Sequence, residues 1–372
     1  MKRQILALTL ILLSLAVLLF VTCTRQKEPI KIGLSVTLSG PGGAPGEHIR
    51  DGALQAVEEI NLQGGINGRL LQLLVRDDRN NEHGIRLADE FLIDEGVAVI
   101  IGHSQSANTL TAYPYVTSQG TILMTAYTSV SELSGRDDLF LRTSVDCDLY
   151  GVKTAALLHE KDLRSVAFLI DMSNPAFGNA WVEQTERHFQ GKTHVVRFHS
   201  AESPDWPQIS EELLATVPDV IFLLTESSAS ATVAQFIRQR NTTIPLMASV
   251  WAQSRELINI GGKSVEGMTL ISFVNPENSR PDYQDFSRKL EQNFGKKASA
   301  RSARAYEMVT ILADALGRLS VINTETLKAA LLAGEYESLL GKVKFDPFGD
   351  VVRPVYEFTV NNGAFTTVGE IR

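Results

Sequence analysis

From Ile30 onward, short runs of β-branched and other apolar residues alternate with longer segments in which apolar residues recur every three or four positions. The longer segments, such as Glu47–Asn61 and Glu82–Glu95, have the spacing of amphipathic helices. The short runs predict strands at Ile30–Val36, Leu70–Val75, Val97–Ile101, Thr121–Met124, Ser165–Ile170, His194–Phe198, Val220–Leu224 and Ile244–Ala248. This alternation is typical of α/β domains with parallel sheets.

The alternation is interrupted twice. A strand-like Leu139–Arg142 leads into Asp146–Asp148 before the rhythm restarts, and a Pro/Asn/Ser-rich stretch, Phe273–Tyr283, precedes two helices at Tyr283–Phe294 and Ala300–Leu319. The chain then ends in predicted strands at Lys342–Phe345, Val351–Val360 and Ala364–Glu370, separated by the turns Asp346–Gly349 and Asn361–Gly363. We therefore predict two doubly wound parallel-sheet lobes joined by three crossovers, with a ligand cleft between the lobes.

Length and composition agree with two lobes. A chain of 372 residues is too long for one ordinary core, and 44% hydrophobic residues exclude disorder. We place lobe 1 at residues 30–143 plus 274–346 and lobe 2 at residues 144–273 plus 347–372. The formal net charge is −8, and without the first 22 residues, which hold two bases and no acids, it is −10. Such an acidic chain argues against a nucleic-acid partner.

The N-terminus has the pattern of an export signal. Lys2 and Arg3 precede an apolar run from Ile5 to Val21, and polar sequence follows Cys23. We interpret residues 1–22 as a signal peptide, Cys23 as the lipidated first residue of a lipoprotein, and residues 23–29 as a tether. An uncleaved anchor and an ordinary cleaved signal remain alternatives. All three place the rest of the chain in the periplasm or at the cell surface, and lipid on Cys23 would anchor it to the membrane.

Motifs for catalysis and metal binding are incomplete. Gly102–Ser106 lacks the last glycine of a nucleophile elbow, and the second ligand position of a zinc motif that would start at His159 holds Leu163. Cys147 lies between two aspartates, which disfavour its thiolate. The remaining histidines are interpreted as surface residues: His48, His83, His103, His188, His194 and His199. We predict no enzyme activity, no metal and no cofactor.

Polar residues follow the predicted strands, where ligands bind in open parallel sheets. Ser106 opens a predicted helix after Val97–Ile101, and Tyr127–Ser129 follows the neighbouring strand. Together they would suit a carboxylate, although Ser106 could equally be only a helix N-cap. In the second half, Phe177 and Trp251 lie in predicted strand-end segments and are either core aromatics or ligand contacts.

The chain resembles the type I periplasmic binding proteins of the leucine/isoleucine/valine-binding class, which feed ABC importers. The resemblance covers nearly the whole mature chain. It is carried by Ser39–Pro41, Gly46, Asp51–Ala53, Glu58–Asn61, Gly64–Arg69 and Asp77–Asp78, and continues through Gly102, His103, Ser106 and Gly120–Leu133.

The resemblance implies roles for individual residues. It implies that Ser106 and Ser129 hold the α-carboxylate of the ligand, together with backbone groups around Tyr127 and Thr128, and that Phe177 lies on the ligand. The family's usual acid for the ligand ammonium is missing, because the corresponding segment reads Ala248-Ser249-Val250-Trp251. Glu226 could replace that acid, or could be an exposed residue at a helix start. If it does not replace it, the expected ligand is an aromatic or branched carboxylate without an amine.

The resemblance also implies a function. We expect a monomeric extracytoplasmic solute-binding protein that captures an amino acid or related small carboxylate and delivers it to an inner-membrane ABC permease. The alternative is a sensor of the same fold that signals to a membrane receptor.

Overall fold

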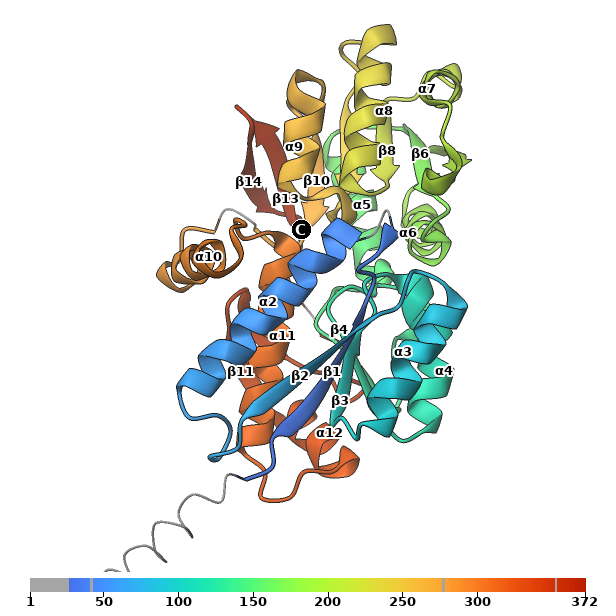
Figure 1. Ribbon diagram of the computed structural model, residues 1–372. Helices are drawn as coiled ribbons and strands as arrows, with labels where there is room; N and C mark the ends of the chain where they lie inside the picture. The colour runs from blue at the N-terminus through green and yellow to red at the C-terminus, as the bar shows by residue number, and fades with distance from the viewer. Residues whose placement is uncertain (1–26, 41–42, 276–277, 352) are drawn as a thin grey trace, which may run out of the picture.

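The computed structural model describes residues 27–40, 43–275, 278–351 and 353–372, and these form two α/β lobes stacked one above the other (Figure 1). The predicted signal peptide and Cys23 lie outside the described residues. The α/β class and the two-lobe arrangement predicted from the alternation of strands and helices are confirmed.

The first lobe is built on a five-stranded, fully parallel sheet with the strand order β2-β1-β3-β4-β5. Its strands are β1 (Ile30–Val36), β2 (Leu71–Asp77), β3 (Val99–Gly102), β4 (Ile122–Thr125) and β5 (Phe140–Arg142). Its helices are α2 (Gly43–Leu62), α3 (Glu82–Asp94), α4 (Ser106–Ser118), α11 (Ala300–Gly317) and α12 (Thr324–Ala333).

The two faces of this sheet follow from the alternation of side chains along each strand. In β3, Val99 and Ile101 belong to the core shared with α2 and α11, whereas Ile100 belongs to the core shared with α3 and α4. The central strand β3 is therefore buried on both faces, which explains its continuous apolar run, whereas the edge strand β2 is only partly buried.

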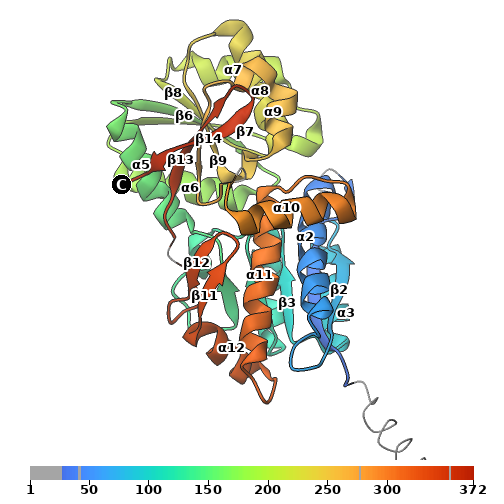
Figure 2. The same ribbon diagram turned by 90° about the vertical axis from the view of Figure 1, so that its left-hand side faces the viewer.

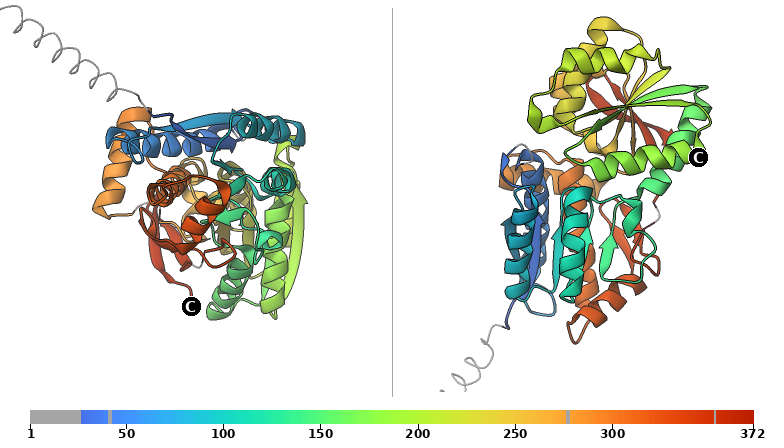
Figure 3. Two further views of the ribbon diagram at one scale, coloured as in Figure 1. Left: turned by 90° about the horizontal axis from the view of Figure 1, so that it is seen from below. Right: turned by 90° about the vertical axis from the view of Figure 1, so that its right-hand side faces the viewer.

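The second lobe is built on a seven-stranded sheet with the order β14-β13-β10-β9-β8-β6-β7, seen with its strands fanning out in Figure 3. Its strands are β6 (Ser165–Asp171), β7 (Lys192–Phe198), β8 (Val220–Leu224), β9 (Leu246–Ser249), β10 (Thr269–Ser272), β13 (Tyr356–Asn361) and β14 (Ala364–Glu370). Its helices are α5 (Cys147–Glu160), α6 (Pro175–His188), α7 (Trp206–Ala215), α8 (Ser227–Arg240) and α9 (Arg255–Gly261). Only β13 and β14 run antiparallel to their neighbours.

The chain passes between the lobes near Ser144, near Val274 and near Val351. After the second passage, α10 (Pro281–Phe294) packs on α2, and the hairpin of β11 (Glu335–Ser338) and β12 (Gly341–Lys344) lies beside α11 (Figure 2). Residues of α11 and α12 share a core with β1 and α2. The boundaries of 30–143 plus 274–346 for lobe 1 and 144–273 plus 347–372 for lobe 2 stay a prediction, and Val351, which packs in the core with β1 and α2, lies with the first lobe.

Several local predictions need correction. The expected strand Val351–Val360 is a strand only from Tyr356, because Pro354 has no N–H to donate to a sheet. The sequence pattern also missed β10, β11 and α12. The turn at Asn361–Gly363 is confirmed as a two-residue hairpin loop, in which Asn362 and Gly363 both have positive φ.

Candidate binding site between the lobes

The carboxyl ends of the two sheets face each other across a small cavity of about 40 Å³, here called the interlobe cavity. The first lobe contributes Ser104, Tyr127, Ser129, Ala300, Arg301 and Arg304, and the second contributes Asn174, Phe177, Val250, Trp251 and Gln253. A neighbouring cavity of about 330 Å³ shares Ser104, Trp251 and Arg301 with it. Residues after β3, β4, β6 and β9 thus converge, as expected for ligand sites in doubly wound sheets.

The predicted site residues divide into two groups. Tyr127, Ser129, Phe177 and Trp251 line the interlobe cavity. The other three do not line it: Ser106, Thr128 and Glu226. Thr128 is buried and its hydroxyl lies 2.5 Å from that of Thr109, so its side chain serves the packing of α4 on the sheet.

Ser106 does not cap α4. Gln105 occupies the N-cap position of α4, and Ser106 is the first helical residue, so the N-cap interpretation is wrong. The buried Ser106 hydroxyl accepts the backbone N–H of Ser129 at 3.2 Å. The Ser129 hydroxyl in turn lies 3.0 Å from the hydroxyl of Ser144, in the first crossover. Ser129, which lines the cavity, is therefore held by Ser106 through its backbone and by Ser144 through its hydroxyl.

The two predicted aromatic residues form an apolar wall. Phe177 lies in the first turn of α6 and packs edge-to-face against Trp251, with ring centroids 5.9 Å apart and an interplanar angle of 86°. Phe177 is 4% exposed and also contacts the buried Trp181. The two alternatives for these residues are therefore compatible, because they belong to the core of the second lobe and face the cavity.

Glu226 lies at the N-cap of α8 and lines the larger, neighbouring cavity. Its Oε2 accepts the N–H of Ser228, and its Oε1 lies 4.0 Å from Nη2 of Arg301. The carboxylate charge of Glu226 is thus next to a cation of the other lobe.

Sequence reasoning missed the arginines of α11. Arg304 is 6% exposed, and its Nη2 donates to the hydroxyl of Ser144 at 3.1 Å. Its guanidinium lies 4.8 Å from the ring centre of Tyr127 and 5.0 Å from that of Phe273. A signal existed, because helical spacing places Arg304 on the same face as the buried Met308, Ile311 and Leu312. A charged residue on a buried face indicates a specific partner.

The charge of Arg304 has no counterpart within its own surroundings. Among the described residues, no carboxylate oxygen is found within salt-bridge distance of its guanidinium, and Nε has no hydrogen-bond partner. Burial lowers the pKa of Arg304, which the tyrosines Tyr127 and Tyr150 only partly oppose. By contrast, the nearby buried Arg353 donates to Glu307 at 2.8 Å.

Two further polar residues of the cavity were not singled out. Asn174 Oδ1 accepts the N–H of Ala107 at 3.1 Å, a bond that joins α6 of the second lobe to the start of α4 in the first. Gln253 is 2% exposed, and its Oε1 accepts the hydroxyl of Ser272 while its Nε2 has no partner. Both could have been predicted from the sequence, because each is an amide side chain in the segment that follows a strand, β6 for Asn174 and β9 for Gln253.

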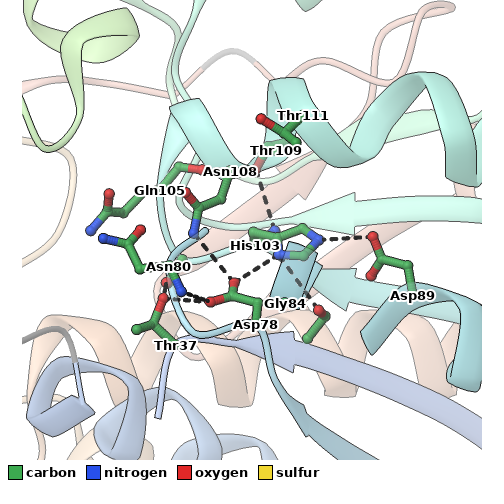
Figure 4. Close-up of polar contacts among 12 residues, drawn as sticks. Thr37, Asp78, Asn80, Gly84, Asp89, His103, Gln105, Asn108, Thr109 and Thr111 are labelled. Atoms are coloured by element: carbon green, nitrogen blue, oxygen red, sulfur yellow. Dashed lines mark hydrogen bonds and ion pairs between the residues drawn. The ribbon is translucent and has the colours of Figure 1, made fainter. Parts of the chain in front are cut away.

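A second buried charged group lies near the site, at His103 (Figure 4). His103, predicted to lie at the surface, is fully buried between two carboxylates, with Nδ1 2.8 Å from Asp78 and Nε2 3.3 Å from Asp89. Asp78 also accepts the hydroxyl of Thr37 at 2.6 Å. Burial opposes protonation of His103, but the two carboxylates outweigh it and raise the pKa to about 10. The surface interpretation failed because both partners come from other elements.

Tyr127, which lines the cavity, and Cys147, which lies in the core of the second lobe, are neutral at physiological pH. Burial raises the pKa of the Tyr127 hydroxyl above its ordinary range, although Arg304 and Arg301 oppose the shift. Burial likewise raises the pKa of the Cys147 thiol, and Arg142 only partly opposes this. Cys147 is therefore an inert core residue, in line with the low reactivity inferred from its two neighbouring aspartates.

Comparisons with known proteins identify the family. A family model described as periplasmic binding protein matches residues 29–364. This chain belongs to the periplasmic binding protein family. The leucine-, isoleucine-, valine-, threonine- and alanine-binding protein of Pseudomonas aeruginosa is 24% identical over 368 residues, which are 97% of this chain and 96% of that protein.

Solved structures agree on the fold. A leucine binding protein from Thermotoga maritima has a TM-score of 0.82 at 23% identity and covers 92% of this chain and 99% of its own. A solute binding protein from Rhodopseudomonas palustris, in complex with 3,4-dihydroxybenzoic acid, has a TM-score of 0.83 at 18% identity and covers 92% and 97%. The predicted resemblance to type I periplasmic binding proteins is confirmed.

Membership of this family settles two further points. The relatives of this periplasmic binding protein are solute-binding proteins, not enzymes, and the family acts outside the cytoplasm. Within the described ranges, we find no helix that is both long and apolar enough to cross a membrane.

Proposed function

We propose that this protein is the extracytoplasmic solute-binding component of an ABC importer and captures an amino acid or related small carboxylate in the interlobe cavity. The observation that carries the proposal is the composition of the cavity wall. The Ser129 hydroxyl, the Arg304 guanidinium and the Gln253 amide all bring donors to a space that both lobes enclose. Donors converging from both lobes suit an anion.

Contacts across the cavity connect ligand binding to lobe closure. Asn174 of the second lobe bonds to Ala107 of the first, and Arg301 donates to the backbone oxygen of Trp251 at 3.3 Å. We infer that ligand held between these walls stabilises the closed arrangement, with hinge bending at the crossovers, and that a permease reads the closed form.

Two ligand classes are compatible with the fold. The Pseudomonas aeruginosa relative is named for binding amino acids, and structural neighbours from Rhodopseudomonas palustris hold benzoate or hydroxylated benzoates. In this chain, we propose that Ser129, Tyr127 and the backbone of Thr128 bind the carboxylate, and that Ser106 positions Ser129. Phe177 and Trp251 are proposed for the apolar part. Glu226 is a candidate for an ammonium only if the ligand carries one.

A thermal-shift screen tests capture. Amino acids, aromatic acids, short aliphatic acids and the matching amides are added to the purified chain. A ligand at a hundred times its dissociation constant stabilises the folded state by about 2.7 kcal/mol. We expect acids to raise the melting temperature and the amides to leave it unchanged. Stabilisation by amides but not by acids would contradict an anion site.

The importer role needs a separate test. We expect membrane vesicles that contain the cognate permease to accumulate a labelled ligand only when this protein is added. Binding without uptake, together with ligand-dependent co-purification of a membrane receptor, would instead support the sensing alternative.

Intact mass of the membrane-extracted protein would test the lipid on Cys23, since a diacylglyceryl addition is expected there. Size-exclusion chromatography would test the expected monomer.

A further inference from the structure

We propose that the ligand is a monocarboxylate without an ammonium group, and that Arg304 is its counter-charge. This inference rests on the proposed function, because it concerns the ligand of the same cavity. It narrows the ligand from any small carboxylate to acids that carry a net charge of −1.

The first argument is the charge balance around the cavity. Arg301 has Glu226 4.0 Å away, and Arg353 has Glu307 at 2.8 Å. Arg304 has no carboxylate oxygen within salt-bridge distance among the described residues, although both Arg304 and Arg353 keep an unbonded Nε. A buried charge without compensation is costly, so the missing negative charge has to come with the ligand. A zwitterionic amino acid has no net charge and would leave the positive charge of Arg304 uncompensated.

The second argument is that the cavity-lining atoms without a hydrogen-bond partner are donors. Two nitrogens of cavity-lining residues are buried without partners, Nε of Arg304 and Nε2 of Gln253. No aspartate or glutamate is present among the described residues that line the interlobe cavity. The interlobe cavity itself therefore offers donors and no carboxylate, and the unbonded Oε1 of Glu226 lines the neighbouring cavity instead.

The third argument concerns the apolar part of the ligand. Phe177 and Trp251 form the edge-to-face wall described above, and Val250 and Ala300 line the same space. In an amino-acid site, part of this wall would have to supply acceptors for three ammonium protons. An apolar wall opposite a buried guanidinium fits an aromatic or branched acid.

Matched ligand pairs test the ligand class directly. We would compare 3-phenylpropanoate with L-phenylalanine, and 4-methylpentanoate with L-leucine, because each pair differs only in the amine. Isothermal titration calorimetry on the full mature chain gives the dissociation constants. The expected result is binding of at least one amine-free acid about tenfold or more tightly than its amino acid, since an unpaired ammonium would be buried.

Variants test the role of Arg304. For Arg304→Gln, we expect about tenfold to a hundredfold weaker binding of the acid, while the melting temperature without ligand stays the same or rises, because an uncompensated buried charge is removed. A merely structural arginine would lower the melting temperature instead. Arg304→Lys keeps the charge and should retain part of the affinity. Arg353→Gln is the matched control: it breaks a buried ion pair, so it should lower the melting temperature and change the affinity by less than about threefold.

The outcomes separate this inference from the proposed function. If an amino acid binds more tightly than its amine-free partner, the inference is overturned and the binding protein stands. Unchanged affinity in Arg304→Gln would overturn the assigned counter-charge. If neither the acids nor the amino acids bind, both the inference and the proposed carboxylate site fail.

Discussion

Two of the buried cations of the first lobe, His103 and Arg304, differ in their surroundings. His103 lies between Asp78 and Asp89, with carboxylate oxygens 2.8 and 3.3 Å from its ring nitrogens. Arg304 lies beside the hydroxyl of Ser144 and the rings of Tyr127 and Phe273. One cation therefore has its counter-charges within the fold, and the other has none in the described part of the chain.

The difference separates a charge that the fold itself compensates from a charge that is left for a ligand to compensate. Despite full burial, the carboxylates raise the pKa of His103 to about 10, whereas burial lowers the pKa of Arg304. The charged form of His103 is stabilised by the fold itself. The charged form of Arg304 is destabilised until an anion arrives, so removing each cation should have opposite effects on the unliganded protein.

The largest expected effect is that of His103→Gln on stability. The substitution leaves two buried carboxylates opposite a neutral amide, and breaking a buried ion pair costs about 3–5 kcal/mol. Urea unfolding at pH 7 measures this loss. His83→Gln, at an exposed position, is the control and should change the free energy of unfolding by less than about 0.5 kcal/mol. A similar result for both variants would contradict a structural role for His103.

The pH dependence of stability is the next largest effect. The pKa of His103 is about 10 in the folded protein and about 6.5 when unfolded, so between these values the folded state binds more protons. The stabilisation is complete below pH 6.5 and is lost as the pH rises. From pH 7 to 9, the free energy of unfolding should fall by about 1.4 kcal/mol per pH unit. This slope should disappear in His103→Gln and persist in His83→Gln.

The hydroxyl groups beside Arg304 provide a smaller effect. Ser129→Ala should weaken carboxylate binding by roughly tenfold to a hundredfold, because a hydrogen bond to a charged group contributes about 1.5–3 kcal/mol. Ser106→Ala should in addition lower stability by about 1–3 kcal/mol, since it leaves the buried N–H of Ser129 without an acceptor. Calorimetric titration and urea unfolding of each variant give both quantities. Equal affinities for both variants and the wild type would place the carboxylate elsewhere.

The smallest expected effect distinguishes the two roles of Glu226. If this carboxylate mainly compensates Arg301, Glu226→Gln adds net positive charge and should tighten binding of an amine-free acid by about threefold to fivefold, roughly 1 kcal/mol. If it were instead an ammonium partner, amino-acid binding would fall sharply in this variant. Titrating the same matched acid and amino acid against Glu226→Gln decides between them.

Much of the fold and part of the site followed from local sequence. Strands such as Ile30–Val36 and Val220–Leu224 were predicted with their observed bounds. Val220–Leu224 is buried at every position, and such a strand needs an unbroken apolar run. Ser129, Phe177 and Trp251 line the interlobe cavity, and the sequence placed each of them after a strand at its carboxyl end. The strands β10 and β11 were not predicted, because their short apolar runs lack a distinctive pattern.

What the sequence by itself determined is the order of its elements and the sheet edge that borders the interlobe cavity, since both depend on apolar periodicity along a single segment. The tertiary structure decided which charges are compensated. Asp78 and Asp89 reach His103 from the end of β2 and from α3, while Arg304 meets Ser144 across 160 positions of the chain. Charge pairing depends on distances of a few ångströms between separate elements, and only packing of those elements sets such distances.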